Sequence, residues 1–173
     1  MKYFVVDTNV GVVANGAAPQ ADEECRDVCI GALERVRRNR ILLDEELRIL
    51  GEYLQRLNLA GQPGPGDAFL KWVFEVQADT RHCERIEITP REGAEDDFEE
   101  FPQDESLKGF DPADRKFVAV ALASGRHPLV LNAVDSDWGH YHSSLKRHGV
   151  QVEFLCPQHV SENSKPPRKR RRK

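Results

Sequence analysis

Residues 3–9 read Tyr-Phe-Val-Val-Asp-Thr-Asn, an apolar run that ends in a carboxylate and two small polar residues. A short run rich in aromatic and β-branched residues is typical of a buried strand in a parallel sheet. Ligands of open α/β sheets bind just beyond the carboxyl ends of the strands. Asp7 is therefore a candidate site residue, with Thr8 and Asn9 beside it. The alternative is that these three residues only cap the strand and begin a turn.

Strands and helices alternate along the rest of the sequence. Hydrophobic periodicity predicts strands near 40–43, 85–89, 128–132 and 150–155, and helices near 21–38, 45–59, 67–76, 111–123 and 137–148. Residues 11–19 are predicted to form a loop, and residues 90–110 a long acidic connection. This alternation predicts an α/β fold, a three-layer α/β/α sandwich around a central, mainly parallel sheet.

The distribution of charge divides the chain into a body and a tail. A length of 173 residues suits one domain, which we expect to span residues 1–158. Residues 159–173 are predicted to form a disordered basic tail, because they combine high charge with proline. Without the seven basic residues of 164–173, 18 Lys and Arg face 29 Asp and Glu. An acidic body with a basic tail suggests a polyanionic partner.

Hydropathy and cysteine content bear on the cellular location. The sequence has no run of 18 apolar residues, so we expect no membrane association. The first predicted strand leaves no room for a secretory signal, so the predicted location is cytoplasmic. Of four cysteines, Cys25 and Cys29 share the apolar stripe of one predicted helix and are interpreted as small core residues. A cysteine metal site is the less favoured alternative, because no Cys-x2-Cys pair is present.

Further carboxylates fall at places where this scaffold would gather them. Asp114 lies in the first turn of a predicted buried helix, and Asp135 and Asp137 follow a predicted strand. Helix-start and turn roles are the alternatives for these residues. A buried carboxylate is costly unless a cation compensates its charge. Mg²⁺ and Mn²⁺ bind carboxylates together with phosphate oxygens, and such ions activate water and orient a phosphodiester for hydrolysis.

Four short motifs in this order resemble the PIN domain family. Residues 5–10 (Val-Val-Asp-Thr-Asn-Val) resemble its opening motif, and residues 49–53 (Ile-Leu-Gly-Glu-Tyr) resemble its second. Asp114 with the apolar run 117–121 is similar to the third motif, and residues 134–138 (Val-Asp-Ser-Asp-Trp) are similar to the fourth. The resemblance covers about residues 3–155.

The resemblance implies an Mg²⁺- or Mn²⁺-dependent endoribonuclease with a PIN-like fold. It implies that Asp7, Glu52, Asp114 and Asp135 are the catalytic and metal-binding residues, with Asp137 as an outer or alternative ligand. Many PIN proteins are toxins of toxin–antitoxin modules, so the resemblance also implies RNA as the substrate, a cognate antitoxin as a candidate partner and a homodimer as a candidate assembly.

The sequence departs from the PIN pattern near two of these acids. The fourth motif usually has Thr or Ser two positions before its first Asp, whereas this chain has Ala133, so Asn132 becomes the candidate polar support for Asp135. On a helical wheel Glu52 lies away from the stripe of Leu47, Leu50, Leu54 and Leu57, and Glu46 lies near it. We favour Glu52 because it fits the motif and because predicted helix ends shift by a residue or two.

The sequence leaves two other functions open, and the tail has several candidate roles. A phosphohydrolase of the haloacid dehalogenase type needs a second Asp where this chain has Asn9. A non-catalytic RNA- or protein-binding module on the same fold is the alternative from a different class. The basic run at the end of the tail is a candidate site for RNA phosphates, a nuclear-localisation peptide or a solubilising segment. It consists of Arg168, Lys169, Arg170, Arg171, Arg172 and Lys173.

Overall fold

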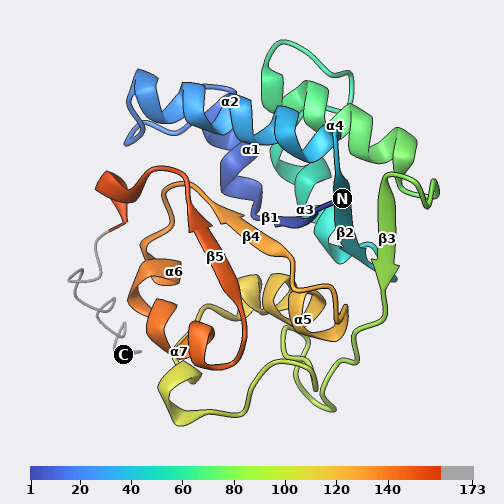
Figure 1. The fold of residues 1–173 in the computed structure, drawn as a ribbon, viewed down its shortest axis with the longest axis vertical. Helices are drawn as coiled ribbons and strands as arrows, with labels where there is room; N and C mark the ends of the chain where they lie inside the picture. The colour runs from blue at the N-terminus through green and yellow to red at the C-terminus, as the bar shows by residue number, and fades with distance from the viewer. Residues whose placement is uncertain (161–173) are drawn as a thin grey trace.

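The computed structural model describes residues 1–160 and is built on one sheet of parallel strands (Figure 1). The order across the sheet is β3-β2-β1-β4-β5. The strands are β1 (Tyr3–Val6), β2 (Arg40–Asp44), β3 (Cys83–Ile86), β4 (Leu129–Asn132) and β5 (Gln151–Phe154). Every neighbouring pair is parallel, as expected for strands joined by helical crossovers. The predicted fold class is therefore confirmed.

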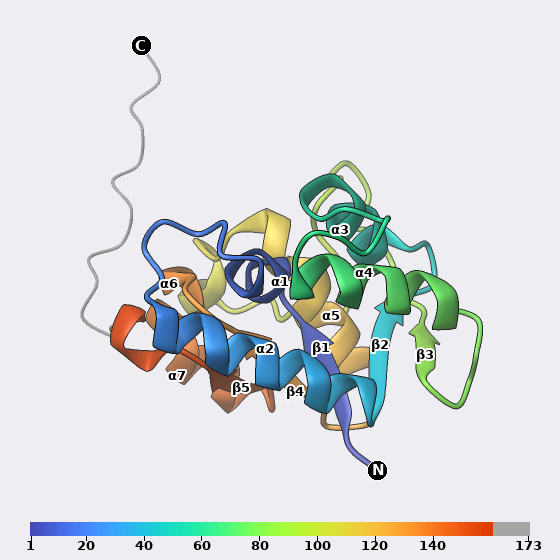
Figure 2. The ribbon, with the colours of Figure 1, turned by 90° about the horizontal axis from the view of Figure 1, so that it is seen from above.

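Helices cover both faces of this sheet. They are α1 (Thr8–Ala14), α2 (Glu23–Arg37), α3 (Arg48–Arg56), α4 (Pro65–Val76), α5 (Arg115–Ala123), α6 (Ser136–His140) and α7 (His142–Arg147). In Figure 2, α2 and α4 lie over the sheet and α5 lies behind it. Helices α1, α2 and α4 pack on one another, whereas α5 packs on β1, β2 and β4 from the other face. Strands β1, β2 and β4 are consequently buried on both sides.

The strand order places a topological switch point between β1 and β4. From β1 the chain moves outward to β2 and then β3, and it returns through α5 to β4 on the opposite side of β1. The connections after β1 and β4 therefore leave the sheet in opposite directions and open a crevice at the carboxyl edge. This is where doubly wound sheets bind their ligands.

The predicted loop at 11–19 is wrong for its first residues, because α1 begins directly after β1. The Asp7 side chain accepts a hydrogen bond from the Asn9 amide and so caps this helix. Val10, Val13 and Ala14 recur at helical spacing and are buried against α2 and α4. The helix spans only seven residues, which is why its periodicity was masked by the small polar residues around it.

The predicted leucine stripe of the second long helix is only partly correct, because Leu50 and Leu57 are buried but Leu54 is exposed. Helix α3 begins at Arg48, three residues later than predicted, and Leu47 before it has a positive φ of 57°. Its buried face consists of Ile49, Leu50 and Tyr53, while Leu54 is 42% exposed. Asp44 does hold the helix start, since its carboxylate accepts from the amides of residues 48 and 49.

Two further segments differ from the predictions. The single helix predicted at 137–148 is divided into α6 and α7 at Tyr141, whose backbone leaves α-helical values (φ −98°, ψ 7°) while its ring packs on Phe110. The acidic connection is anchored by four apolar side chains that enter the core. These are Phe98, Phe101, Leu107 and Phe110.

The end of the described chain is tied to α2. Cys25 in α2 is buried in the core, as predicted, and it also forms a disulfide with Cys156, which follows β5; this bond was not predicted. Cys29 is buried in the core, as predicted, and its thiol is free. His159, which we had assigned to the tail, closes a 3-10 turn (Pro157–His159), and Val160 is buried. The rest of the predicted tail, with its basic run 168–173, lies outside the described residues. In the described chain, no helix has the length and apolarity required to cross a membrane.

Candidate metal centre

Asp7 is positioned at the carboxyl end of the central strand. Its main-chain amide still belongs to the sheet and donates to the carbonyl of Leu131 in β4 (3.0 Å). One carboxylate oxygen accepts from the Asn9 amide (3.0 Å), and the other accepts from the indole Nε1 of Trp138 (2.7 Å). The cap role and the site role therefore coexist, and two donors fix the orientation of a carboxylate that is only 4% exposed.

Asp135 approaches from the other side of the switch point. It caps α6 by accepting from the amide of Asp137 (2.9 Å) through one carboxylate oxygen. Asn132 supports it through the backbone, because its amide nitrogen donates to the Asp135 carbonyl (3.0 Å). Asn9 joins the two loops: its side chain donates to Asn132 (2.8 Å) and accepts from the Ala133 amide (2.8 Å). Asn132 thus supplies the polar support that Ala133 cannot.

Asp114 completes the group from the opposite face of the sheet. It ends a 3-10 turn (Pro112–Asp114) and directly precedes α5, yet its side chain makes no capping hydrogen bond. The helix-start role therefore does not account for a carboxylate that is only 8% exposed. One carboxylate oxygen from each of Asp7, Asp114 and Asp135 lies within 4.8 Å of the other two. The structure thus brings together three of the four acids that the PIN resemblance implies.

Burial and mutual repulsion shape the electrostatics of this group. Burial, followed by the charges of Asp7 and Asp135, raises the pKa of Asp114 well above its usual range. Burial likewise raises the pKa of Asp7, with Asp135 and Glu52 adding to the effect, although the Asn9 amide opposes it. Among the ion pairs of residues 1–160, only that of Lys116 with Glu52 reaches this site. Within residues 1–160, none of the three aspartates forms an ion pair, although Arg56 also lines the cavity.

Glu52 lies in the same cavity but outside the tight group of three. Its carboxylate accepts from the Thr8 hydroxyl and from the Lys116 ammonium (3.3 Å), and its side chain is 26% exposed. Because the helix buries Ile49, Leu50 and Tyr53, Glu52 faces the site, and Glu46 is exposed before the helix. Glu52 is therefore suited to contact an ion through water, or a second ion.

Asp137 and Lys116 contact the segments that surround the three aspartates. Asp137 accepts from the Asp111 amide (2.8 Å) and so fixes the turn that carries Asp114. Lys116 was missed by the sequence reasoning, although its position two residues after Asp114 places it next to the site. Its ammonium also donates to the Ala113 carbonyl. The indole donor of Trp138 was missed as well, because no local pattern connects residue 138 with residue 7.

The cavity above these acids has a volume of about 350 Å³ and is lined by residues from both sides of the switch point. The residues that contribute carboxylates to it are Asp7, Glu52, Asp111, Asp114 and Asp135. In an octahedral Mg²⁺ site, ligand oxygens lie about 2.9 Å to 4.2 Å apart, and the ion prefers oxygen donors. Three carboxylates within 4.8 Å of one another fit such an ion with small side-chain movements.

The metal-free protein is expected to lose stability as the pH rises from about 5 to about 8. The folded-state pKa values of Asp7 and Asp114 lie above their unfolded values, so the folded state binds more protons in this range. Their contribution to stability is complete below the unfolded pKa of about 3.9 and is lost as the pH rises through the raised folded values. Urea unfolding in EDTA at several pH values measures the effect. The Asp114→Asn variant should show a weaker pH dependence, and a metal-free wild type that becomes more stable over this range would contradict the prediction.

Comparisons with known proteins identify no relative. The sequence matches no protein-family model, no curated protein and no solved structure. Assignment to a family therefore goes no further than the motif resemblance, and the function has to be argued from the site itself.

Proposed function

We propose that this protein is a divalent-metal-dependent endoribonuclease of the PIN-like type. The observation that carries the proposal is the convergence of Asp7, Asp114 and Asp135, whose carboxylate oxygens lie within 4.8 Å of one another. They come from three separate connections and meet at the switch point of a parallel sheet. A purely structural role gives no reason to bury so much like charge at one place.

Each residue has a definite task in this proposal. Asp7, Asp114 and Asp135 would hold Mg²⁺ or Mn²⁺, and the donors of Trp138 and Asn9 would fix the orientation of the Asp7 carboxylate. When bound, such an ion lowers the pKa of water and neutralises charge on a phosphodiester. Glu52, which is paired with Lys116, would accept the proton of the attacking water. The chain needs no cysteine or serine nucleophile for this chemistry.

RNA is the substrate class that the proposal names. The acidic cavity repels a phosphodiester backbone until cations fill it, so binding and turnover should both depend on the metal. The PIN resemblance favours RNA over DNA, and the basic run 168–173 would attract either polyanion. A toxin role, a cognate antitoxin, a homodimer and a cytoplasmic location are parts of the same proposal that depend on the sequence interpretation alone.

The structure also bears on the haloacid dehalogenase alternative. That mechanism needs an acid two residues after Asp7, and this chain has Asn9 there. The side chain of Asn9 is engaged with Asn132 and with the Ala133 amide, so it serves to join two loops. This arrangement supports the nuclease proposal over the phosphohydrolase.

The proposal is tested by a cleavage assay on mixed-sequence RNA and on single-stranded DNA. We expect internal cleavage of RNA with Mn²⁺ or Mg²⁺ and none with EDTA. Glu52→Gln should lower the rate by about 10- to 100-fold, which is typical when a group next to the ligands is altered. Glu46→Gln is the matched control because Glu46 is exposed outside the cavity, and it should cleave at the wild-type rate. Cleavage that persists in EDTA, or a Glu46→Gln variant as impaired as Glu52→Gln, would refute the proposal.

A further inference from the structure

A second cluster of metal-binding side chains lies away from the acidic cavity. The sulfur atoms of Cys25, Cys29 and Cys156 all lie within 4.8 Å of one another, and all three residues are buried. Cys25 and Cys29 are one turn apart on α2, and Cys156 follows β5 on the neighbouring part of the chain. Because the disulfide uses only two of the three sulfurs, the thiol of Cys29 is left beside the bond.

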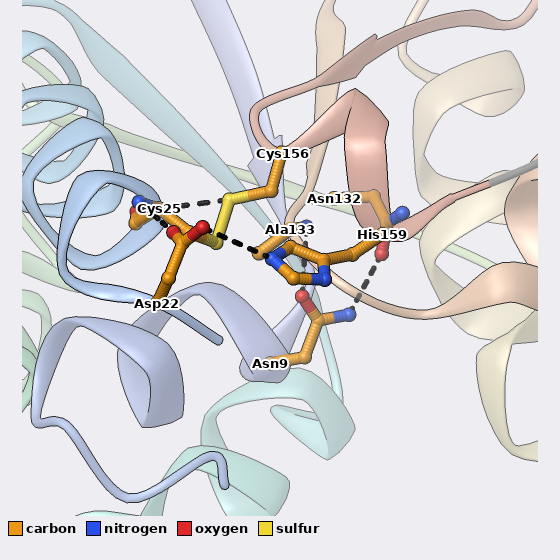
Figure 3. Close-up of a disulfide and its surroundings, with 7 residues drawn as sticks. All are labelled: Asn9, Asp22, Cys25, Asn132, Ala133, Cys156 and His159. Carbon is orange, nitrogen blue, oxygen red and sulfur yellow. Dashed lines mark hydrogen bonds and ion pairs between the residues drawn. A yellow bond between two sulfur atoms is a disulfide. The ribbon is translucent and has the colours of Figure 1, made fainter. Parts of the chain in front are cut away.

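A histidine stands next to these sulfurs. His159 follows Cys156 in the same 3-10 turn, and its main-chain amide donates to the Cys156 carbonyl (2.9 Å). Its ring Nε2 is buried without a hydrogen bond, and the Asp22 carboxylate lies 3.9 Å away. Asp22 also accepts from the Cys25 amide (2.8 Å), so the ring is close to the start of α2. Figure 3 shows the His159 ring beside the disulfide, with one nitrogen turned toward Asp22.

We propose that the reduced chain binds one Zn²⁺ through Cys25, Cys29, Cys156 and His159. Zinc in structural sites takes four Cys and His ligands in a tetrahedron, with Zn–S distances of about 2.3 Å, so bound sulfurs lie about 3.8 Å apart. The three sulfurs already meet within 4.8 Å, and His159, whose buried Nε2 has no hydrogen bond, would have to move toward them to supply the fourth ligand. The spacing Cys25-x3-Cys29 is within the range that zinc sites use.

The disulfide and the zinc site are two states of the same sulfurs. An added dithiol reduces the Cys25–Cys156 bond to two thiols and closes to its own disulfide, which balances the two electrons and two protons. Zinc binding then displaces the protons of the three thiols. In both states α2 is tied to the segment after β5. The ligand set separates this site from the acidic one, because thiolates select zinc while carboxylates select Mg²⁺ or Mn²⁺.

The test uses the full chain, purified under reducing conditions, with zinc or cobalt as the only added metal. We expect one zinc per reduced chain and none at these sulfurs in the oxidised chain. Cobalt should give thiolate charge-transfer absorption and strong tetrahedral bands, which an oxygen site does not produce. Cys29→Ala should lose both signals while it still forms the Cys25–Cys156 disulfide when oxidised, which shows that this variant folds. Cys83→Ser is the matched control, since Cys83 is the other buried free thiol, and it should bind normally.

Further variants separate the possible results. His159→Ala should weaken zinc binding by at least about 10-fold. His148 is exposed, so His148→Ala serves as the control and should leave zinc binding unchanged. Zinc affinity unchanged in His159→Ala would overturn the assignment of the fourth ligand. A reduced chain without thiolate absorption overturns the site and leaves a structural disulfide. Zinc binding that is lost in Asp7→Asn but retained in Cys29→Ala would also overturn the proposed cysteine site. The metal would then occupy the acidic cavity.

Discussion

Asp7→Asn is expected to lower RNA cleavage by more than about 100-fold while the fold stays intact. Loss of a partner that merely orients a ligand costs about 10- to 100-fold, and Asp7 is proposed as a ligand itself. The substitution has two opposite effects on the stability of the folded protein. An amide removes one buried negative charge, but it cannot accept from both Asn9 and Trp138, which leaves one donor unpaired at a cost of about 1–3 kcal/mol. Cleavage rates, metal titration and circular dichroism measure the outcome.

Two companion variants sharpen this test. Asp114→Asn should lose activity to a similar degree, and because Asp114 makes no capping bond, it should also stabilise the metal-free protein near pH 8. Asp96→Asn removes an exposed carboxylate that does not line the cavity and should behave like the wild type. If Asp7→Asn cuts RNA at the native rate, the metal site is wrongly placed. If Asp96→Asn is equally inactive, the loss reflects overall charge rather than the site.

Trp138→Ala is expected to destabilise the protein by about 3–5 kcal/mol, the usual cost of truncating a buried aromatic side chain. The Trp138 ring is fully buried and packs edge-on against Phe110 at 5.1 Å, so its loss opens a cavity between α6 and the acidic connection. Trp138→Phe keeps a ring there but removes the donor to Asp7. We expect it to cost only about 1–2 kcal/mol and to weaken Mg²⁺ or Mn²⁺ binding by about 10- to 100-fold.

The other tryptophan provides the control for this pair. Trp72 is half-buried on α4 and packs against Phe69, away from the acidic cavity, so Trp72→Phe should leave metal affinity unchanged. Urea unfolding gives the stability differences, and calorimetric titration gives the affinities. Equal metal affinity in Trp138→Phe and wild type would show that the indole serves packing alone.

The parallel sheet could be predicted from sequence because its central strands carry a local signal. Phe4, Val5 and Val6 form an unbroken apolar run. The helices that connect the strands show apolar residues at helical spacing, which is a second local signal. Helix α1 escaped prediction because it is short and its first residues also serve the site. Leu54 was wrongly assigned to the buried face of α3 because it fits the wheel, whereas tertiary packing buries Ile49 and Tyr53 beside Leu50.

The acids of the site could be proposed from the order of their motifs, but their partners could not. Asp7, Asp114 and Asp135 each follow or precede a recognisable element, so topology alone brings them together. The indole of Trp138, the ammonium of Lys116 and the bridge made by Asn9 are contacts between residues distant in sequence. Spacing gives no information about such contacts. The Cys25–Cys156 disulfide, with a sequence separation of 131, was missed for the same reason.

The long return from edge strand β3 through α5 to β4 has a consequence for synthesis. During translation, Asp7 emerges early, whereas Asp114 and Asp135 emerge only after the outer half of the sheet has been made. A growing chain that lacks β4 has no partner for one side of β1, so its acids cannot be gathered. The group of three carboxylates therefore forms only after β4 has been made and has paired with β1.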